Sequence, residues 1–107
     1  DADGKVHFFT NNGGNFQITN PNYQNIDVGQ FAQPQIIDVN RDGLNDLIIG
    51  EQDGTINYLP NSGTTTNAIF DTIITNWGGV DVDQSYISTG FSNPTLYDSS
   101  GVYQLFV

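Results

Sequence analysis

The sequence predicts an all-β protein built from antiparallel strands, and three observations support this. Helix-forming residues are scarce, because the 107-residue chain contains one Lys, one Arg and one Glu. Gly, Asn and β-branched residues are common instead, and these favour turns and strands over helices. Short apolar runs recur between Gly, Asn, Asp and Pro residues, as strands alternating with turns require. No segment shows a helical period.

Individual elements can be placed from these runs. Strands are expected at 6–9 and 56–59, each directly after an Asp-Gly pair that favours a tight turn because Gly accepts a positive φ. The run 47–49 is apolar at consecutive positions, which predicts a strand covered on both faces. Loops are expected at 12–15 and 61–64.

The chain also repeats itself. Residues 3–13 align with residues 53–63, and residues 29–34 align with 89–94. The second alignment continues with Asp38 matching Asp98 and with 47–49 matching 105–107, while 26–28 is echoed at 80–82. The unit is therefore fifty to sixty residues long, which accommodates four short strands.

The phase of the repeat divides the chain into three parts. Residues 1–28 form the second half of one unit plus a linker, 29–75 a complete unit, and 76–107 a linker with the first half of the next unit. About two units' worth of strands is present, cut out of phase at both ends. We therefore expect an excerpt of a longer chain or one piece of an assembly.

Charge and composition exclude several function classes. Twelve acidic residues against two basic ones give a formal net charge of −10. Such a polyanion is repelled by phosphate backbones and by anionic lipid surfaces, so we expect no nucleic-acid partner. No apolar run is long enough to span a bilayer. The absence of Cys excludes disulfides, thiolate metal sites and Cys nucleophiles.

One motif carries chemistry. Residues 38–46 read D-x-N-x-D-G-x-x-D, which places oxygen donors at loop positions 1, 3, 5 and 9 and Gly at position 6. Such spacing lets a tight loop wrap one cation, and the flexible oxygen coordination of Ca²⁺ suits it better than the strict geometry of Mg²⁺. The expected metal ligands are Asp38, Asn40, Asp42, the carbonyl of Leu44, and Asp46.

Other readings of this loop are possible. An Asp/Asn-rich turn without metal would leave three carboxylates repelling one another, with only Arg41 nearby to compensate. A helical EF-hand requires a bidentate Glu at loop position 12, where this chain has Ile49. The flanking segments are predicted strands. The motif therefore predicts a strand–loop–strand calcium loop.

The stretch from Phe31 to Gly54 resembles the FG-GAP/VCBS repeat, which forms the blades of integrin-α-like β-propellers. The residues that carry the resemblance are Phe31, Pro34, Asp38, Asn40, Asp42, Gly43, Asp46, Leu47, Ile48, Ile49, Gly50, Asp53 and Gly54. The stretches 77–82 and 90–94 are similar to blade linkers of large secreted bacterial proteins in that group. The resemblance implies four-stranded antiparallel blades, about two blades' worth here, with Ca²⁺ bracing the first two strands of a blade through the five ligands named above. A propeller closes with typically about four to eight blades.

Other candidate residues have simpler interpretations. The third unit has a shorter loop at 98–101, and Gln104 replaces the Asp of motif position 9. A plain β-turn without calcium is therefore expected there. Asp81 and Asp83 could form a second cation site, but the favoured interpretation is that they are exposed carboxylates. Trp77 could stack on a sugar, although packing between blades is favoured. His7 is expected to be a polar strand residue, because Asn57 occupies its place in the repeat.

The favoured function is non-enzymatic. We expect a calcium-binding propeller region of a secreted or cell-surface protein that acts as a scaffold or as an adhesion and ligand-binding module. Its partners would be the rest of its own propeller and a glycan or protein ligand on the cell surface. Two alternatives are an accessory propeller of a carbohydrate-active or other secreted hydrolytic enzyme, by fold-level analogy alone, and a cargo fragment of the type IX secretion machinery.

Overall fold

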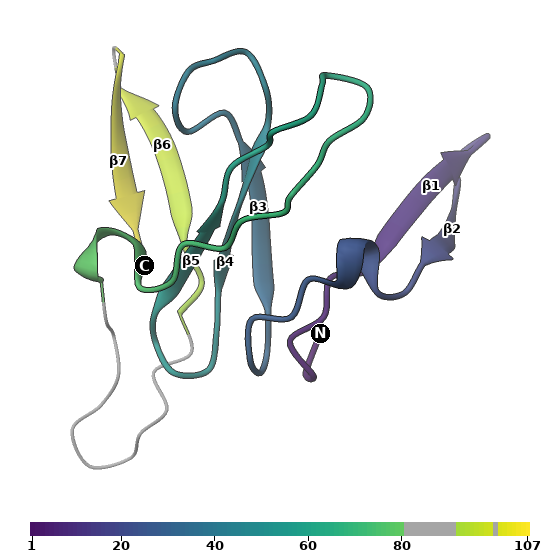
Figure 1. Ribbon diagram of the computed structural model, residues 1–107, viewed down its shortest axis with the longest axis horizontal. Coiled ribbons are helices and arrows are strands. Elements are labelled where there is room, and N and C mark those ends of the chain that lie inside the picture. The colour runs from purple at the N-terminus through teal and green to yellow at the C-terminus, as the bar shows by residue number, and fades with distance from the viewer. Residues whose placement is uncertain (81–91, 100) are drawn as a thin grey trace.

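The computed structural model describes residues 1–80, 92–99 and 101–107, and this part of the chain is all-β, as predicted (Figure 1). Its strands form three antiparallel sheets. We call them the N-terminal hairpin, the central sheet and the C-terminal hairpin. The N-terminal hairpin consists of β1 (Phe8–Asn12) and β2 (Asn15–Asn20). The central sheet consists of β3 (Gln33–Ile37), β4 (Asp46–Gly50) and β5 (Ile56–Leu59). The C-terminal hairpin consists of β6 (Thr95–Ser99) and β7 (Val102–Phe106). The helical segments described are two single 3₁₀ turns, η1 (Tyr23–Asn25) and η2 (Trp77–Gly79).

The central sheet is a meander in the order β3-β4-β5. Its register pairs Ile36 with Leu47 and Ile48 with Tyr58. On the far side of β5, Tyr58 and Ile74 exchange two backbone hydrogen bonds of 2.9 and 2.8 Å. A fourth extended segment therefore begins to pair along this edge of the sheet.

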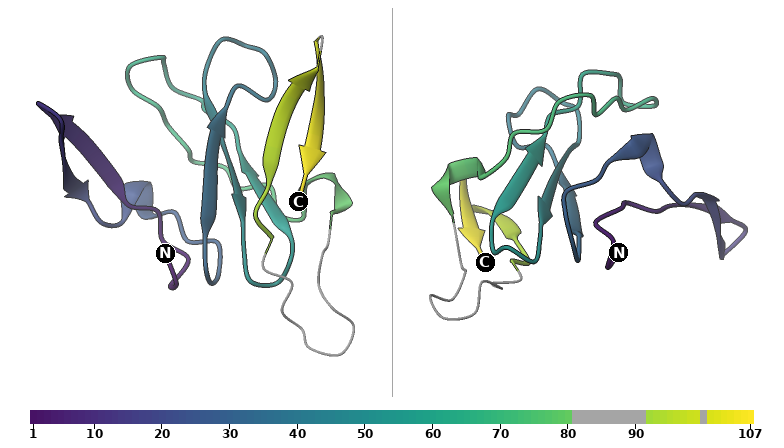
Figure 2. Two further views of the ribbon diagram at one scale, coloured as in Figure 1. Left: turned by 180° about the vertical axis from the view of Figure 1, so that it is seen from behind. Right: turned by 60° about the horizontal axis from the view of Figure 1, so that its bottom comes forward.

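The hairpins lie on opposite sides of the central sheet in every view (Figures 1 and 2). Two hydrophobic clusters lie on the two faces of the central sheet, and β4 contributes to both. Leu47 and Ile49 pack toward the N-terminal segments, whereas Ile48 packs toward Leu96 of β6. All three β4 side chains are at most 3% exposed. The prediction that residues 47–49 form a strand covered on both faces is therefore confirmed.

The repeat seen in the sequence reappears as repeated backbone contacts. The carbonyl of Asp1 accepts hydrogen bonds from the N–H groups of Gly4 (3.1 Å) and Ala32 (2.9 Å). Fifty residues later, the carbonyl of Glu51 accepts the corresponding bonds from Gly54 (3.2 Å) and from Ser92 (2.9 Å). Each Asp-Gly turn is thus hydrogen-bonded in the same way to the segment that precedes the next sheet.

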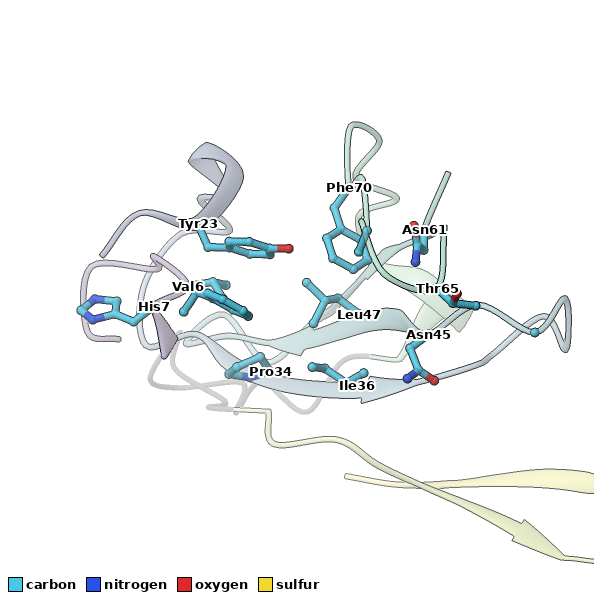
Figure 3. A pocket seen from close by; sticks show the side chains of 13 residues that line it. Val6, His7, Tyr23, Pro34, Ile36, Asn45, Leu47, Asn61, Thr65 and Phe70 are labelled. Atoms are coloured by element: carbon cyan, nitrogen blue, oxygen red, sulfur yellow. The ribbon is translucent and has the colours of Figure 1, made fainter. Parts of the chain in front are cut away.

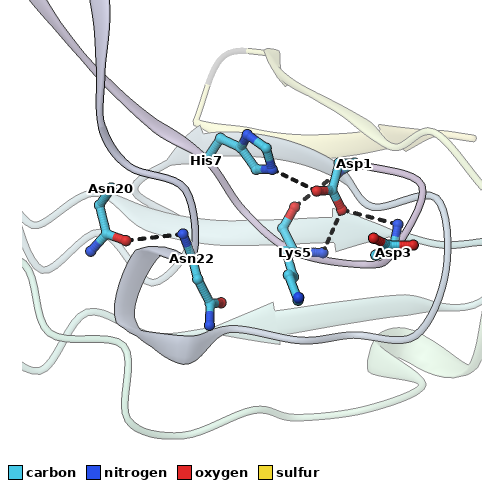
Figure 4. Close-up of polar contacts among 6 residues, drawn as sticks. All are labelled: Asp1, Asp3, Lys5, His7, Asn20 and Asn22. Atoms are coloured by element: carbon cyan, nitrogen blue, oxygen red, sulfur yellow. Dashed lines mark hydrogen bonds and ion pairs between the residues drawn. The ribbon is translucent and has the colours of Figure 1, made fainter.

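Side chains repeat these contacts as well. Asp1 binds His7 through a 2.5 Å contact between Oδ2 and Nε2, and its Oδ1 accepts the backbone N–H groups of Asp3 and Lys5 (Figure 4). At the equivalent place, Asn57 donates to the carboxylate of Glu51 over 3.1 Å. The acidic residue that opens each turn therefore holds a side chain six positions further along.

Aromatic packing follows the same pattern. The ring of Phe8 stacks on Tyr23 of η1 with centroids 5.0 Å apart, and the ring of Tyr58 packs on Trp77 of η2 at 5.3 Å. The N-terminal hairpin pairs Phe8 with Asn20, just as Tyr58 pairs with Ile74. β1 and β5 are therefore equivalent strands, each followed by a partner on the same edge and by a 3₁₀ turn.

Some boundaries differ from the sequence expectation. The first strand begins at Phe8 instead of residue 6 and continues to Asn12, and the expected loop at 12–15 narrows to the two glycines Gly13 and Gly14, both with positive φ. β2 was not predicted, because its sequence is rich in Asn and Gln and its side chains are mostly exposed. In the third unit, β6 and β7 pair as far as Ser99 and Val102, and residue 100 of the expected turn lies outside the described residues.

Candidate metal centre

The motif loop connects β3 to β4, as expected for a strand–loop–strand arrangement. It leaves the sheet after Ile37 and returns at Asp46, the first residue of β4. Two residues in the left-handed region, Arg41 (φ +60°) and Gly43 (φ +88°), turn the chain. Gly at loop position 6 thus provides the sharp turn for which the motif requires it.

Side-chain oxygens of the motif fold the loop back on itself. Asp38 accepts the backbone N–H of Asp42 on Oδ1 (3.1 Å) and that of Gly43 on Oδ2 (2.9 Å). The same N–H of Asp42 is shared with the Asn40 side chain at 3.2 Å. Asp42 in turn accepts the N–H of Leu44 at 2.9 Å. The loop is therefore held by short Asx-type contacts that suit Asp and Asn.

Asp46 differs from the other motif residues because it is fully buried. Its Oδ2 accepts the backbone N–H of Val39 at 3.0 Å and the hydroxyl of Tyr58 at 3.1 Å, and its Oδ1 accepts the N–H of Asn61 at 2.8 Å. One carboxylate thus ties together the loop, β5 and the segment after β5. Burial of a charge is tolerated only when it is hydrogen-bonded in this way.

The electrostatic effect of the loop is visible at Tyr58. Burial, the charge of Asp46 together with the hydrogen bond to it, and the charges of Asp42 and Asp38 raise the pKa of Tyr58 to about 12. The phenolate is disfavoured because it would add a negative charge where three carboxylates already act. The loop is thus a concentrated source of negative potential at the edge of the central sheet.

The predicted ligands Asp38, Asn40, Asp42, Leu44 and Asp46 all lie in or at the end of this loop. Within residues 1–80, 92–99 and 101–107, however, no three His, Cys, Asp or Glu side chains are grouped closely enough to hold a metal as they stand. The carboxylates of Asp38, Asp42 and Asp46 accept backbone N–H groups instead.

The donor set nevertheless suits a hard cation. Each carboxylate oxygen can accept about two hydrogen bonds or ligand contacts. Within the described part of the chain, Asp38 accepts one hydrogen bond on each oxygen and Asp42 accepts one on Oδ1. Oxygen-only ligation on a mostly exposed loop is what Ca²⁺ accepts and what softer metals avoid.

Contacts from β7 to the loop were not predicted. The hydroxyl of Tyr103 donates to the carbonyl of Asp38 at 2.6 Å, and the guanidinium of Arg41 lies 4.3 Å from the centre of the Tyr103 ring. Residues 38 and 103 are far apart in the chain, and no motif links them. The loop is consequently braced by the C-terminal hairpin, so its geometry depends on how the sheets pack.

The remaining candidates can be placed as well. Trp77 packs on Tyr58 and against the cluster of Ile48 and Leu96, which is the packing role favoured over sugar stacking. His7 is an exposed residue paired with Asp1. Asp81 and Asp83 lie outside the described residues.

Comparison with known protein families, with characterised proteins and with solved structures finds no significant match to this chain. Among the described residues, no helix has the length and hydrophobicity needed to cross a lipid bilayer.

Proposed function

We propose that this chain is a calcium-binding repeat region of a β-propeller in a secreted or cell-surface protein. In this role it is a non-enzymatic scaffold or adhesion module, and Ca²⁺ has a structural function. The ion would be held by Asp38, Asn40, Asp42, the carbonyl of Leu44 and Asp46. It would offset the loop's negative charge and fix the connection between β3 and β4.

The observation that carries the calcium proposal is the placement of the motif, whose oxygen donors lie on one short loop between β3 and β4 that turns at Arg41 and Gly43. Three motif carboxylates also act together on the buried hydroxyl of Tyr58, so they form one field of negative charge. A divalent cation bound to these carboxylates would relieve this field. Against the described residues, the carboxylates of Asp38 and Asp42 also keep acceptor capacity, as a ligand set requires.

The propeller part of the proposal is supported by the repeated architecture. The central sheet is a meander with a fourth segment pairing at Ile74, and the same turn, bridge and aromatic contacts recur in the N-terminal hairpin. β4 contributes side chains to a hydrophobic cluster on each of its two faces. Radial repetition of small antiparallel sheets is the architecture that such units build.

Location and partners follow from the chemistry of the ion. Extracellular modules bind Ca²⁺ with dissociation constants of roughly 10⁻⁴–10⁻³ M, which suffices outside cells. The proposed partners are neighbouring blades of the same propeller and a glycan or protein on the cell surface.

Thermal unfolding with and without calcium tests the metal. We expect 5 mM CaCl₂ to raise Tm relative to EGTA in the wild type, because a ligand that binds only the folded state stabilises it. In Asp42→Asn the calcium-dependent increase should be largely lost. The amide oxygen can still accept the N–H of Leu44, so Tm in EGTA should change little.

Asp53→Asn is the matched control, since Asp53 is an exposed acid in the turn between β4 and β5. It should keep the full response to calcium. Equal melting curves of the wild type in CaCl₂ and in EGTA would remove the calcium proposal, while leaving the architecture of the sheets untouched.

A further inference from the structure

The motif loop lies between two neighbouring parts of the fold. On the side of the N-terminal segments, Gly43 and Asn45 of the loop line a pocket of about 380 Å³ (Figure 3). On the other side, Val39 of the loop packs against the hydrophobic cluster around Leu96 of β6, as does Tyr103 of β7. The loop is therefore packed against the C-terminal hairpin as well as against its own sheet.

Tyr103 contacts the loop at two places. Its hydroxyl donates to the backbone carbonyl of Asp38 at 2.6 Å. The guanidinium of Arg41 lies 4.3 Å from the centre of its ring, within the range of a cation–π contact. Asp38 and Arg41 are positions 1 and 4 of the motif, so one side chain of the C-terminal hairpin spans the first turn of the loop.

These contacts leave the proposed ligand atoms available. Tyr103 binds the backbone carbonyl of Asp38, whereas the proposed ligand from that residue is its carboxylate. The carboxylate points back into the loop, where it accepts the N–H groups of Asp42 and Gly43. Tyr103 thus fixes the backbone of a ligand residue without competing for the ion.

Support from outside matters for this loop because its middle is exposed. Residues 40–43 are exposed, and both Arg41 (φ +60°) and Gly43 (φ +88°) are in the left-handed region. Affinity is reduced when binding must first order such a segment, and it is retained when the segment is already held in place. The hydrogen bond and the ring contact from Tyr103 hold the loop before any ion binds.

We propose that Ca²⁺ binding at the motif loop is coupled to the packing of the C-terminal hairpin on the central sheet, with Tyr103 as the positioning residue. This coupling rests on the calcium site proposed above. The packed hairpin raises the calcium affinity of the loop, and bound calcium favours the packed hairpin by the same factor, because coupling between two equilibria is reciprocal. Calcium thus stabilises the contact between successive units as well as the connection between β3 and β4.

Calcium titration followed by NMR tests the coupling at the loop. CaCl₂ is added to the isotope-labelled wild type and variants, and the amide signals of residues 38–46 give the dissociation constant. Tyr103→Phe removes only the hydroxyl and should bind calcium about three- to ten-fold more weakly, within the range that the net effect of one hydrogen bond allows. Tyr103→Leu also removes the ring beside Arg41 and should lose at least as much affinity.

Hydrogen exchange of the β6 and β7 amides tests the same coupling at the hairpin. Saturating calcium should slow their exchange in the wild type, because the ion favours the packed hairpin. The gain in protection should be about three- to ten-fold smaller in Tyr103→Phe, since reciprocity requires the same factor as in the titration. In EGTA these amides should stay protected in Tyr103→Phe, which separates a positioning role from unfolding of the hairpin.

Tyr23→Phe is the matched control. It makes the same chemical change on the other face of the central sheet, where Tyr23 packs on Phe8 and Phe70. Neither the calcium affinity nor the exchange of the hairpin should change in this variant. An equal loss of affinity in Tyr23→Phe and Tyr103→Phe would overturn the coupling, because the effect would not come from the contact with the loop.

Two further outcomes distinguish this coupling from the calcium site itself. Equal calcium affinities of the wild type and Tyr103→Phe would overturn the coupling and leave the calcium site in place. A wild type whose amide signals in residues 38–46 do not respond to CaCl₂ would overturn the proposed function, and the coupling with it.

Discussion

Tyr58 provides the sharpest quantitative prediction, because its hydroxyl reports on the whole carboxylate loop. The side chain is 8% exposed and donates to the buried carboxylate of Asp46. Its pKa is raised from 10.0 to about 12 by burial and by the charges of Asp46, Asp42 and Asp38. Replacing it by Phe removes the ionisable group and keeps the ring that packs on Trp77.

The sign of the pH dependence follows from this raised pKa. In the unfolded chain the hydroxyl ionises near 10.0, whereas in the folded chain it stays protonated until about 12. The stabilisation it contributes is therefore complete below pH 10 and is lost as the pH rises through 12. The full effect corresponds to roughly 3 kcal/mol, since each pKa unit is worth about 1.4 kcal/mol.

Urea unfolding between pH 8 and pH 12 measures this effect. At pH 8, Tyr58→Phe should be less stable than the wild type by about 1–3 kcal/mol, because a hydrogen bond to a charged acceptor is lost. Above pH 10 the wild type should lose stability more steeply than the variant, and the difference between them should close. Tyr23→Phe, which changes a tyrosine outside the carboxylate loop, should follow the steep wild-type curve. If wild type and Tyr58→Phe lose stability in parallel across this range, the coupling between Tyr58 and the loop is refuted.

Three other substitutions have defined outcomes. Gly50→Ala places a methyl group 2.2 Å from the carbonyl oxygen of Ser92, so urea unfolding should show a loss of about 1–3 kcal/mol. Asp46→Asn puts an amide N–H₂ among groups that already donate, and we expect a loss of about 2–4 kcal/mol in the same assay even with calcium present. Trp77→Ala removes the half-buried ring that packs on Tyr58 and should lower the free energy of unfolding by about 1–3 kcal/mol.

Matched variants separate these effects from general damage. Gly13→Ala introduces only the strain of a positive φ, because no atom lies near the new methyl group, and it should cost less than Gly50→Ala. Asp53→Asn removes an exposed charge and should be nearly neutral. Trp77→Phe should recover part of the stability lost in the alanine variant. A Trp77→Ala protein as stable as the wild type would contradict its packing role.

Strands that are apolar and buried could be predicted from the sequence, and polar ones could not. The run 47–49 was placed correctly because consecutive apolar residues need cover on two faces. β2 was not predicted, because its residues form backbone hydrogen bonds while their side chains stay mostly exposed. Such a strand has no hydrophobic pattern in its sequence. The start of β1 was also misplaced, since residues 5 and 6 bond to the segment 23–27 instead of to β2.

The candidate metal loop was located by its motif, but its surroundings were not. The spacing of Asp38, Asp42 and Asp46 predicted a turn between two strands, and the structure has that turn. The motif did not predict that Asp46 is buried and accepts hydrogen bonds from three segments of the chain. It also did not predict the hydrogen bond from Tyr103 of β7 to the loop. These contacts are long-range, and a single sequence carries no signal for them.

The repeated junctions show which features of the repeat the fold depends on. The connection from Gly54 to Ser92 is ten residues longer than the connection from Gly4 to Ala32. In each case, however, the two N–H groups donate to one carbonyl at the start of the turn, that of Glu51 in the first pair and that of Asp1 in the second. Lengthening a loop has a small entropic cost, because that cost grows only with the logarithm of its length. Packing of one sheet on the next, in contrast, requires a fixed approach at this junction. The hydrogen bonds at the junction are therefore kept while the length of the connection varies. Substitutions at the junction should weaken the packing of one sheet on the next more than insertions into the longer connection do.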